Sequence, residues 1–450
     1  MGKYFGTDGF RGEVGRQLTT EHAFAIGRFM GHHLQGDHRP RVLIGKDTRR
    51  SSYTLEYGLI AGLTASGAEA HLVHVLPTPG VSYLVQTQGF DCGIMISASH
   101  NRFSDNGIKI FAQNGAKLDD DTTALLETFL DGERTLPSAQ GTDIGTAVDA
   151  GPMGERYMTH LRQSVQGDLK GLRVGLDCAN GSASRLGEML FRNLGATVFP
   201  LHCTPDGVNI NRSCGSTHPE SLQRLVVEKG LDVGFALDGD ADRCIAVDHA
   251  GRVVDGDGIL YVMGQYLKAA GRLKHNTVIT TVMSNMGLYQ ALDALDITYE
   301  STPVGDRFVH ERMVQTDCVL GGEQSGHIIF GEYADTGDGL LTALLIAERI
   351  CRSGKSLQQL TAGFHSYPQL TKTFYVSNRE MVMADPAVLQ VVQEAAVALA
   401  GKGRVLARTS GTEPAVRLTV EAPDGAFCRK IVERMAEILQ QRRFLSDADH

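Results

Sequence analysis

One pattern occurs three times along the chain and limits the folds open to it: a short apolar strand, a polar loop, a helix and a second strand. The copies begin at residues 41–45, 172–176 and 278–281, and each helix carries leucines at helical spacing. A strand, a helix and a second strand in succession favour parallel pairing within one sheet. The repetition therefore predicts three related mixed-sheet α/β domains with largely parallel pairing.

The pattern changes after residue 370. Strand-like segments at 373–376, 403–408 and 416–421 alternate with helical segments at 388–399 and 426–439. This arrangement predicts a smaller C-terminal α+β domain. The polar tail after Arg442 is expected to fray.

The chain needs more than one hydrophobic core, because 450 residues exceed the usual size of a single domain. A segment at 136–152 is rich in Gly, Ser, Thr and Pro and has no period, which is typical of a boundary. We expect four domains, at residues 1–148, 149–250, 251–367 and 368–450.

Charge and cysteine usage exclude several classes of protein. A net charge of −9 argues against a general nucleic-acid surface, although local Arg and Lys clusters could still bind a small anion. No apolar stretch is long enough for a membrane span, and the N-terminus has no signal core. The eight cysteines include no C-x-x-C pair. They predict reduced core residues and a cytoplasmic location.

Three aspartates alternate after an apolar run. Asp238, Asp240 and Asp242 follow residues 233–237, and on an extended backbone their carboxylates would point the same way. Three hard oxygen ligands suit Mg²⁺. An EF-hand is excluded, because Arg243 replaces its glycine and His249 its closing glutamate. A solvated acidic turn is the alternative, but mutual repulsion of three carboxylates favours a cation.

Three further loops have ambiguous chemistry when taken singly. The loop at 97–109 places small hydroxyl residues, a His and an Asn after a strand, and the loop at 322–327 offers a carboxylate and a hydroxyl to a sugar. The loop at 408–414, with Arg417, could wrap a phosphate. Each could equally be an ordinary turn. Arg11, on a glycine-rich loop, is either a phosphate clamp or an exposed charge.

Taken together and in order, these four loops resemble the α-D-phosphohexomutase family, and the resemblance covers essentially the whole chain. It implies four domains around a central cleft, with one loop from each domain. Residues 3–9 and Gln324 resemble the members that act on glucosamine phosphates. The alternative is a phosphomannomutase/phosphoglucomutase, which usually carries Met at the place of Gln324.

The resemblance implies a role for each loop. Ser99 resembles the phosphorylated serine, and the predicted Mg²⁺ ligands are Ser99, Asp238, Asp240 and Asp242. The residues implied around the transferring phosphoryl group are Arg11, His100, Lys109 and Arg243. Those implied at the sugar hydroxyls are Gly305, Asp306, Glu323 and Ser325. Those implied at the non-reacting phosphate are Arg408, Ser410, Gly411, Thr412 and Arg417.

The implied reaction interconverts glucosamine 6-phosphate and glucosamine 1-phosphate through phospho-Ser99 and a bound glucosamine 1,6-bisphosphate, and feeds amino-sugar nucleotide and cell-wall precursor synthesis. Lys109 or His100 would accept the proton. A noncatalytic sugar-phosphate-binding protein is a rival reading, and a homodimer is a candidate assembly. A serine hydrolase is set aside, because no G-x-S-x-G surrounds Ser99.

The chain departs from the family pattern at Arg102, where the motif usually has Pro after Ser-His-Asn. Arg frees a φ angle and restores an N–H. This substitution raises the question of how the loop is held rigid.

Overall fold

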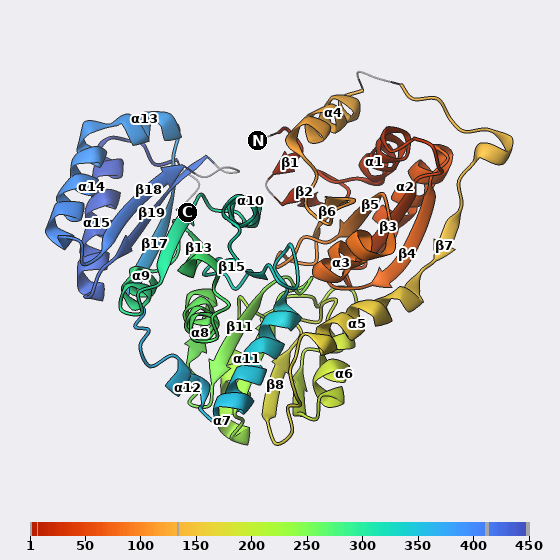
Figure 1. The fold of residues 1–450 in the computed structure, drawn as a ribbon. Helices are drawn as coiled ribbons and strands as arrows, with labels where there is room; N and C mark the ends of the chain where they lie inside the picture. Colours follow the sequence, from red (N-terminus) through yellow and green to blue (C-terminus); the bar gives the residue numbers. More distant parts are fainter. Residues whose placement is uncertain (1, 7, 133–134, 410–413, 447–450) are drawn as a thin grey trace. The chain divides into compact units, whose positions relative to one another are not determined.

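The computed structural model describes residues 2–6, 8–132, 135–409 and 414–446. The chain divides into two compact units. The first comprises Met1–Met283 and Ile297–Ala362, and the second comprises Ser284–Asp296 and Gly363–His450. The described strands form four sheets, coloured from red to blue along the chain in Figure 1.

The first sheet has seven strands in the order β1-β2-β6-β5-β3-β4-β7. Its central strands β3, β4 and β5 are parallel, and β6, β2 and β1 continue the sheet antiparallel. The strands are β1 Phe5–Gly6, β2 Gly9–Glu13, β3 Arg41–Lys46, β4 Glu69–Val75, β5 Cys92–Ile96, β6 Asp105–Ala112 and β7 Ala147–Asp149. The predicted boundary at 148/149 falls within β7, and the three predicted boundaries between the four domains stay predictions.

The second and third sheets have the same mixed character. In the second, with order β12-β11-β10-β8-β9, the strands β8, β9 and β10 are parallel and β11 and β12 are antiparallel. Its strands are β8 Arg173–Asp177, β9 Thr197–Leu201, β10 Val233–Leu237, β11 Cys244–Asp248 and β12 Val253–Val254. The third has the order β14-β13-β15-β16, with strands β13 Thr277–Thr281, β14 Thr298–Thr302, β15 Leu320–Gly322 and β16 Ile328–Phe330.

Helices of the first unit pack against these sheets. On the first sheet, Val42 and Ile44 pack into the same core cluster as Ile26, Leu55 and Leu59, whereas a side chain at Gly45 would meet Val81. The α-helices are α1 Thr20–His33, α2 Ser52–Ala65, α3 Thr78–Gln88, α4 Asp120–Leu130, α5 Gly154–Gln163, α6 Leu186–Asn193, α7 Glu220–Lys229, α8 Gly256–Ala269, α10 Asp306–Thr316, α11 Gly339–Ser353 and α12 Leu357–Leu360. The 3-10 helices are η1 Gly141–Asp143, η2 Gly151–Met153 and η3 Lys274–Asn276. Within the described ranges, no helix combines the length and the apolar character needed to cross a membrane.

Helices α1 and α2 approach each other closely because glycines lie between them. A Cβ atom at Gly62 would stand 2.1 Å from the carbonyl oxygen of Phe24, and one at Gly27 would stand 2.5 Å from that of Leu59. Real Cβ atoms essentially never approach backbone so closely. These two glycines therefore fix the spacing of the helix pair.

The second unit contains an antiparallel sheet in the order β17-β19-β18. Its strands are β17 Gln369–Tyr375, β18 Arg404–Thr409 and β19 Ala415–Glu421, and its helices are α9 Met286–Asp293, α13 Arg379–Ala384, α14 Pro386–Leu399 and α15 Gly425–Gln441. The predicted fraying after Arg442 is wrong for residues 444–446. Phe444 packs against the core of this unit, and Ser446 N donates to Tyr375 O over 3.0 Å.

Candidate active site

Ser99 lies in the loop between β5 and β6, with its side chain fully buried. Its hydroxyl donates a hydrogen bond of 2.5 Å to Asp238 Oδ2, and His100 Nδ1 lies 3.3 Å from the same hydroxyl oxygen. The backbone of Ser99 is left-handed, with φ of 51°. A strained conformation of this kind in a residue other than glycine is common at functional sites.

Asp238, Asp240 and Asp242 are buried and converge: one carboxylate oxygen of each lies within 4.8 Å of the others. The expected extended backbone is wrong. The segment forms a turn in which Ala241 has φ of 57° and Ala241 N donates to Asp238 O over 3.1 Å. The turn, rather than strand alternation, brings the three carboxylates together.

Burial and neighbouring charges shift the pKa values within the carboxylate group. Burial and the charges of Asp242 and Asp240 raise the pKa of Asp238 well above its usual range. Burial opposes the charge on Lys109, but Asp240 and Asp242, at 2.8 and 3.0 Å from its Nζ, raise the pKa of this lysine. Lys109 therefore stays a cation among the carboxylates.

The buried Asp240 Oδ1 accepts no hydrogen bond within the described part of the chain, and Asp242 Oδ1 has only the longer ion-pair contacts of His327 Nδ1 at 3.7 Å and Arg243 Nε at 3.9 Å. Buried carboxylate oxygens without donors are costly unless a cation binds them. Hard oxygen donors of this kind suit a hard divalent cation. The residues present therefore fit a metal ion.

Two arginines border the serine. Arg243 Nη1 lies 3.2 Å from His100 Nδ1, and the Arg243 backbone N–H donates to Asp238 Oδ1 over 3.1 Å. Burial, together with Arg243 and Arg11, lowers the pKa of His100 to about 4, so its imidazole is neutral at neutral pH. The Nε–H groups of Arg11 and Arg243 are buried without an acceptor among the described residues. They are donors available to an anion.

The predicted sugar loop lies between β15 and β16. Glu323 Oε1 accepts from the N–H of Gly305 over 3.1 Å, and Gly305 has φ of 134°, a conformation that favours glycine. Asp306 begins α10 and pairs with Lys117 at 2.7 Å. Ser325 is exposed.

A cavity of about 390 Å³ borders the group and has the size of a small-ligand site. Its lining includes three cationic side chains, Lys109, Lys117 and Arg307. The same lining includes three carboxylates, Asp120, Glu127 and Glu311, so the cavity is polar with charges of both signs.

Several polar residues that the sequence did not single out contact the site. Lys117 joins Asp8 to Asp306, with 2.7 Å to each carboxylate, and the Thr78 hydroxyl donates to Asp240 Oδ2 over 2.5 Å. Arg49 and Asn211 donate to backbone oxygens of the Ser99 loop. In the sequence, only their positions after strands could have indicated a role for these residues, because their partners lie far away along the chain.

In the second unit, Arg408 on β18 is the direct cross-strand partner of Arg417 on β19. Burial, then the charge of Arg417, lowers the pKa of Arg408. A pair of arginines side by side suits an anion. Ser410, Gly411 and Thr412 lie outside the described residues.

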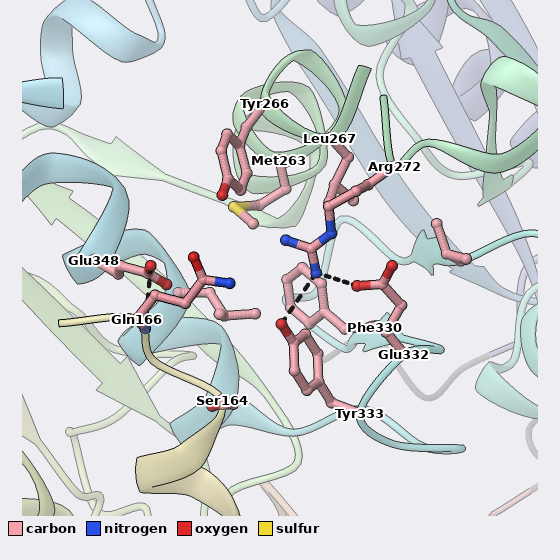
Figure 2. Close-up of a pocket in the computed structure, with 12 residues that line it drawn as sticks. Ser164, Gln166, Met263, Tyr266, Leu267, Arg272, Phe330, Glu332, Tyr333 and Glu348 are labelled. Carbon is pink, nitrogen blue, oxygen red and sulfur yellow. Dashed lines mark hydrogen bonds and ion pairs between the residues drawn. The ribbon is translucent and has the colours of Figure 1, made fainter. Parts of the chain in front are cut away.

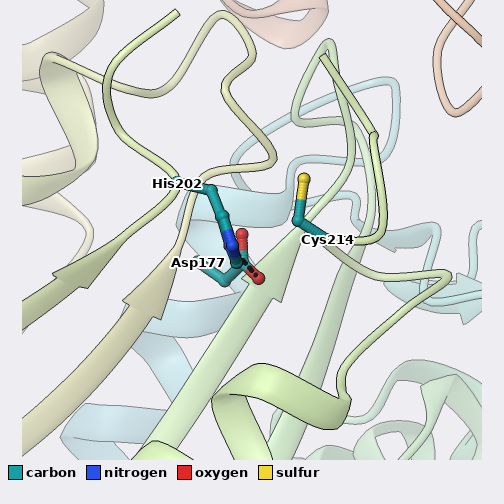
Figure 3. Close-up of side chains that lie close together, drawn as sticks. All are labelled: Asp177, His202 and Cys214. Atoms are coloured by element: carbon teal, nitrogen blue, oxygen red, sulfur yellow. Dashed lines mark hydrogen bonds and ion pairs between the residues drawn. The ribbon is translucent and has the colours of Figure 1, made fainter. Parts of the chain in front are cut away.

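Two other places in the first unit hold polar side chains close together. The hollow in Figure 2 holds about 20 Å³, enough for one water molecule and too little for a sugar phosphate. Its Arg272 is paired with Glu332 and lies 3.1 Å from the Tyr333 hydroxyl. Figure 3 shows Asp177, His202 and Cys214, which also have metal-ligand chemistry.

Comparison with known proteins gives matches over the whole length. The chain is 51% identical to the phosphoglucosamine mutase of Lachnoclostridium phytofermentans, over 98% of this chain and 99% of the relative. It is 49% identical to the enzyme of the same name from Anoxybacillus flavithermus, with the same shares covered. The chain belongs to the α-D-phosphohexomutase family. The resemblance drawn from the four loops is confirmed.

Family models for the phosphoglucomutase/phosphomannomutase domains match in order. The alpha/beta/alpha domains I, II and III match residues 2–136, 155–251 and 255–367, and the C-terminal domain matches 374–438. A phosphoglucomutase/phosphomannomutase family protein from Burkholderia thailandensis shares the phosphohexomutase fold, with a TM-score of 0.80, 23% identity and 98% of each chain covered. The predicted fold class, three α/β domains and a different fourth domain, is confirmed.

A more distant phosphohexomutase structure contains ligands. The N-acetylphosphoglucosamine mutase of Aspergillus fumigatus, solved in complex with GlcNAc-6P and magnesium, has a TM-score of 0.67 and 17% identity. The match covers 97% of this chain and 95% of that one.

Proposed function

We propose that the protein is a phosphoglucosamine mutase that interconverts glucosamine 6-phosphate and glucosamine 1-phosphate through a phosphorylated Ser99. The observation that carries the mechanism is the buried Ser99 hydroxyl, which lies 2.5 Å from Asp238 in a group where Asp240 Oδ1 accepts no hydrogen bond from a described residue. Relatives about 50% identical over the whole length, all of them phosphoglucosamine mutases, support the choice of sugar.

The cofactor that fits is Mg²⁺, held by Ser99, Asp238, Asp240 and Asp242. When bound, it would offset the charge of the phosphoryl group and polarise it. The Nε–H groups of Arg11 and Arg243 supply donors for the phosphoryl oxygens. Lys109 supplies a fixed positive charge beside the same group.

In the first half-reaction, O1 of glucosamine 6-phosphate forms a bond to the phosphorus on Ser99. The bond from phosphorus to Ser99 Oγ breaks, the O1 proton passes to the neutral imidazole of His100, and Ser99 Oγ takes up a proton as it leaves. Lys109, the other candidate acceptor, is already protonated and acts as a charge. The product is glucosamine 1,6-bisphosphate. It turns within the site, its 6-phosphoryl group returns to Ser99, and glucosamine 1-phosphate leaves.

The remaining residues bind rather than react. Glu323 and Ser325, with Gly305 and Asp306, contact sugar hydroxyls. Arg408, Ser410, Gly411, Thr412 and Arg417 hold the phosphate that is not reacting. Burial of Ser99 keeps water from the phosphoserine, which limits hydrolysis between half-reactions.

We place the enzyme in the cytoplasm, where it supplies amino-sugar nucleotide and cell-wall precursor synthesis. All eight cysteines lie in the described part of the chain and are free thiols, as a reducing compartment favours. A homodimer is the proposed assembly, to be checked by light scattering on the purified protein.

The test is turnover of glucosamine 6-phosphate against mannose and glucose phosphates, with peptide mass spectrometry of the purified protein. We expect the amino sugar to give the highest kcat/KM and phosphate to be found on Ser99. A preference for mannose or glucose phosphates would overturn the choice of sugar. Full activity in Ser99→Ala would overturn the mechanism.

A further inference from the structure

Arg49 is fully buried, and its guanidinium makes five hydrogen bonds, equal to the five N–H donors that the group has. Nε donates to Asp47 Oδ2 over 2.8 Å. The other four donate to backbone oxygens of the Ser99 loop: Ser99 O at 2.9 Å, Asn101 O at 2.9 Å, Asp105 O at 3.0 Å and Arg102 O. One side chain thus binds the main chain on both sides of the loop's exposed tip.

A second side chain, from the loop after β9, binds two of the same oxygens. Asn211 Nδ2 donates to Ser99 O over 2.8 Å and to Asn101 O over 3.0 Å. The backbone N–H of Ser99 is bound as well, donating to Ser97 Oγ over 3.0 Å, and the Ser97 hydroxyl in turn donates to Asp47 Oδ2 over 2.6 Å. The carbonyl of Ser99 is therefore held by Arg49 and Asn211, and its N–H by Ser97, which the ion-pair partner Asp47 holds in turn.

These contacts bear on the left-handed backbone of Ser99. A serine in this conformation costs about 1–3 kcal/mol and persists only when its surroundings impose it. Without the Arg49 bonds to Ser99 O and Asn101 O, the left-handed backbone of Ser99 would be held less firmly, by Asn211 and Ser97 alone. The hydroxyl would then leave its position opposite Asp238.

Arg49 also accounts for the tolerance of Arg102. The side chain of Arg102 is exposed, whereas its carbonyl is bound by Arg49. The loop is thus held by its carbonyl groups, so the φ restraint of a proline at position 102 is not needed.

We propose that Arg49 is a positioning residue for the phosphoryl transfer, which holds the backbone of Ser99 so that its oxygen gives and receives the phosphoryl group at one fixed place. This role rests on the proposed mutase reaction through Ser99. Arg49 is buried and does not touch the substrate, so it acts on kcat and leaves KM unchanged.

The same domain offers a matched control in Arg28. It is also buried, at 7% exposure, and donates four hydrogen bonds, to Ala65 O, Ser66 Oγ, Leu136 O and Pro137 O, at 2.6–3.0 Å. None of these acceptors belongs to the site. Arg28→Lys and Arg49→Lys both keep the charge and remove the planar fork, so both should destabilise the fold similarly.

The experiment measures kcat, KM, thermal midpoint and Ser99 phosphorylation for the wild type and both variants. A displacement of about 1 Å at a reacting group costs about 10²-fold in rate, so we expect kcat of Arg49→Lys to fall by about 10²-fold. The KM of Arg49→Lys should stay within about threefold of the wild-type value. Arg28→Lys should keep the wild-type kcat, while its thermal midpoint should fall by as much as that of Arg49→Lys. In Arg49→Ala, added guanidinium ion should restore part of kcat.

A kcat of Arg49→Lys within twofold of wild type would overturn the proposal, as would an equal loss in Arg28→Lys. If Arg49→Lys does not fold, Asn211→Ala removes two of the bonds to the same oxygens. It should lower kcat about tenfold at constant KM, about 1.4 kcal/mol in the barrier, and an unchanged kcat would again overturn the proposal. A wild type without turnover of any sugar phosphate would instead count against the proposed function.

Discussion

The five-stranded sheet carries two groups of metal-ligand side chains after neighbouring parallel strands, and the two differ in what their oxygens already bind. After β10, Asp240 Oδ1 accepts no hydrogen bond from any described residue, and Asp242 Oδ1 has only the longer ion-pair contacts. After β8, Asp177 accepts from Ala179 N over 2.9 Å, from Gly215 N over 3.0 Å and from His202 Nδ1 over 2.9 Å. Hydrogen-bond state therefore distinguishes the candidate metal site from the second group, in addition to residue type.

The thiol of the second group fits this distinction. Burial, together with the charge of Asp177, raises the pKa of Cys214 to about 12. Metal binding at this thiol would have to displace its proton, which lowers the affinity at neutral pH. In the group shown in Figure 3, Asp177 joins its neighbours through His202 Nδ1 and the Gly215 N–H.

The largest expected effect is on catalysis. Asp240→Asn removes a charge from the carboxylate group, so mutase kcat should fall by at least about 10³-fold, which corresponds to several kcal/mol of transition-state stabilisation. Steady-state assays with saturating Mg²⁺ measure it. Asp248→Asn, a buried carboxylate of the same sheet paired with Arg252, is the control and should keep its kcat. Equal losses in both variants would show a general effect of buried carboxylates.

A smaller effect is expected in metal affinity, measured by Mn²⁺ titration with electron paramagnetic resonance. Asp242→Asn should weaken binding by about 10²-fold, since it removes an anionic oxygen ligand from a hard cation. Cys214→Ser should leave the affinity within about twofold and the stoichiometry at one ion. Loss of a bound ion in Cys214→Ser would show that the second group also binds metal, and would contradict the difference expected between the two groups.

Substitutions in the two groups should change the free energy of unfolding in opposite directions. Asp177→Ala leaves two buried N–H donors unpaired, so the free energy of unfolding should fall by about 2 kcal/mol. Asp238→Asn should raise it in metal-free buffer, because burial and two neighbouring carboxylates disfavour the ionised form of Asp238. Urea denaturation followed by circular dichroism gives both values. A destabilised Asp238→Asn would contradict the repulsion argument.

The smallest effect is a pH dependence from His202. The hydrogen bond to Asp177 raises the pKa of His202 above its ordinary 6.5. A raised histidine pKa stabilises the fold below the unfolded-state value, and this contribution is lost as the pH rises through the folded-state value. For this partly exposed group it amounts to less than about 1 kcal/mol. The thermal midpoint of His202→Gln should therefore lie further below wild type at pH 6 than at pH 8.5, and a constant difference would contradict the coupling.

Sequence reasoning reached the fold and the main chemistry because both depend on local patterns. Strand and helix periods predicted the three repeats, and the alternating aspartates predicted an acidic group. The predicted geometry of that group was wrong, because a turn with a left-handed Ala241 cannot be inferred from alternation alone.

The roles of residues whose partners lie far away in the sequence could not be predicted. Arg49 binds main-chain oxygens, which every residue has, so no pattern in the sequence reveals its partners. Lys117 acquires its role only when folding brings Asp8 and Asp306 to it from distant segments. The prediction that the tail frays was wrong for a similar reason. Phe444 packs against a core formed by distant residues, which its polar neighbours in the sequence do not indicate.

The glycines between α1 and α2 limit which substitutions the protein can tolerate at these positions. A side chain at Gly27 or Gly62 would overlap the backbone of the other helix, and backbone cannot yield as a flexible side chain can. In a saturation library selected for activity, both codons should reject nearly all substitutions, as strictly as the codon for Asp240. At these two glycines, intolerance to mutation has a steric cause. A list of intolerant positions would therefore not by itself distinguish the two glycines from residues of the candidate active site.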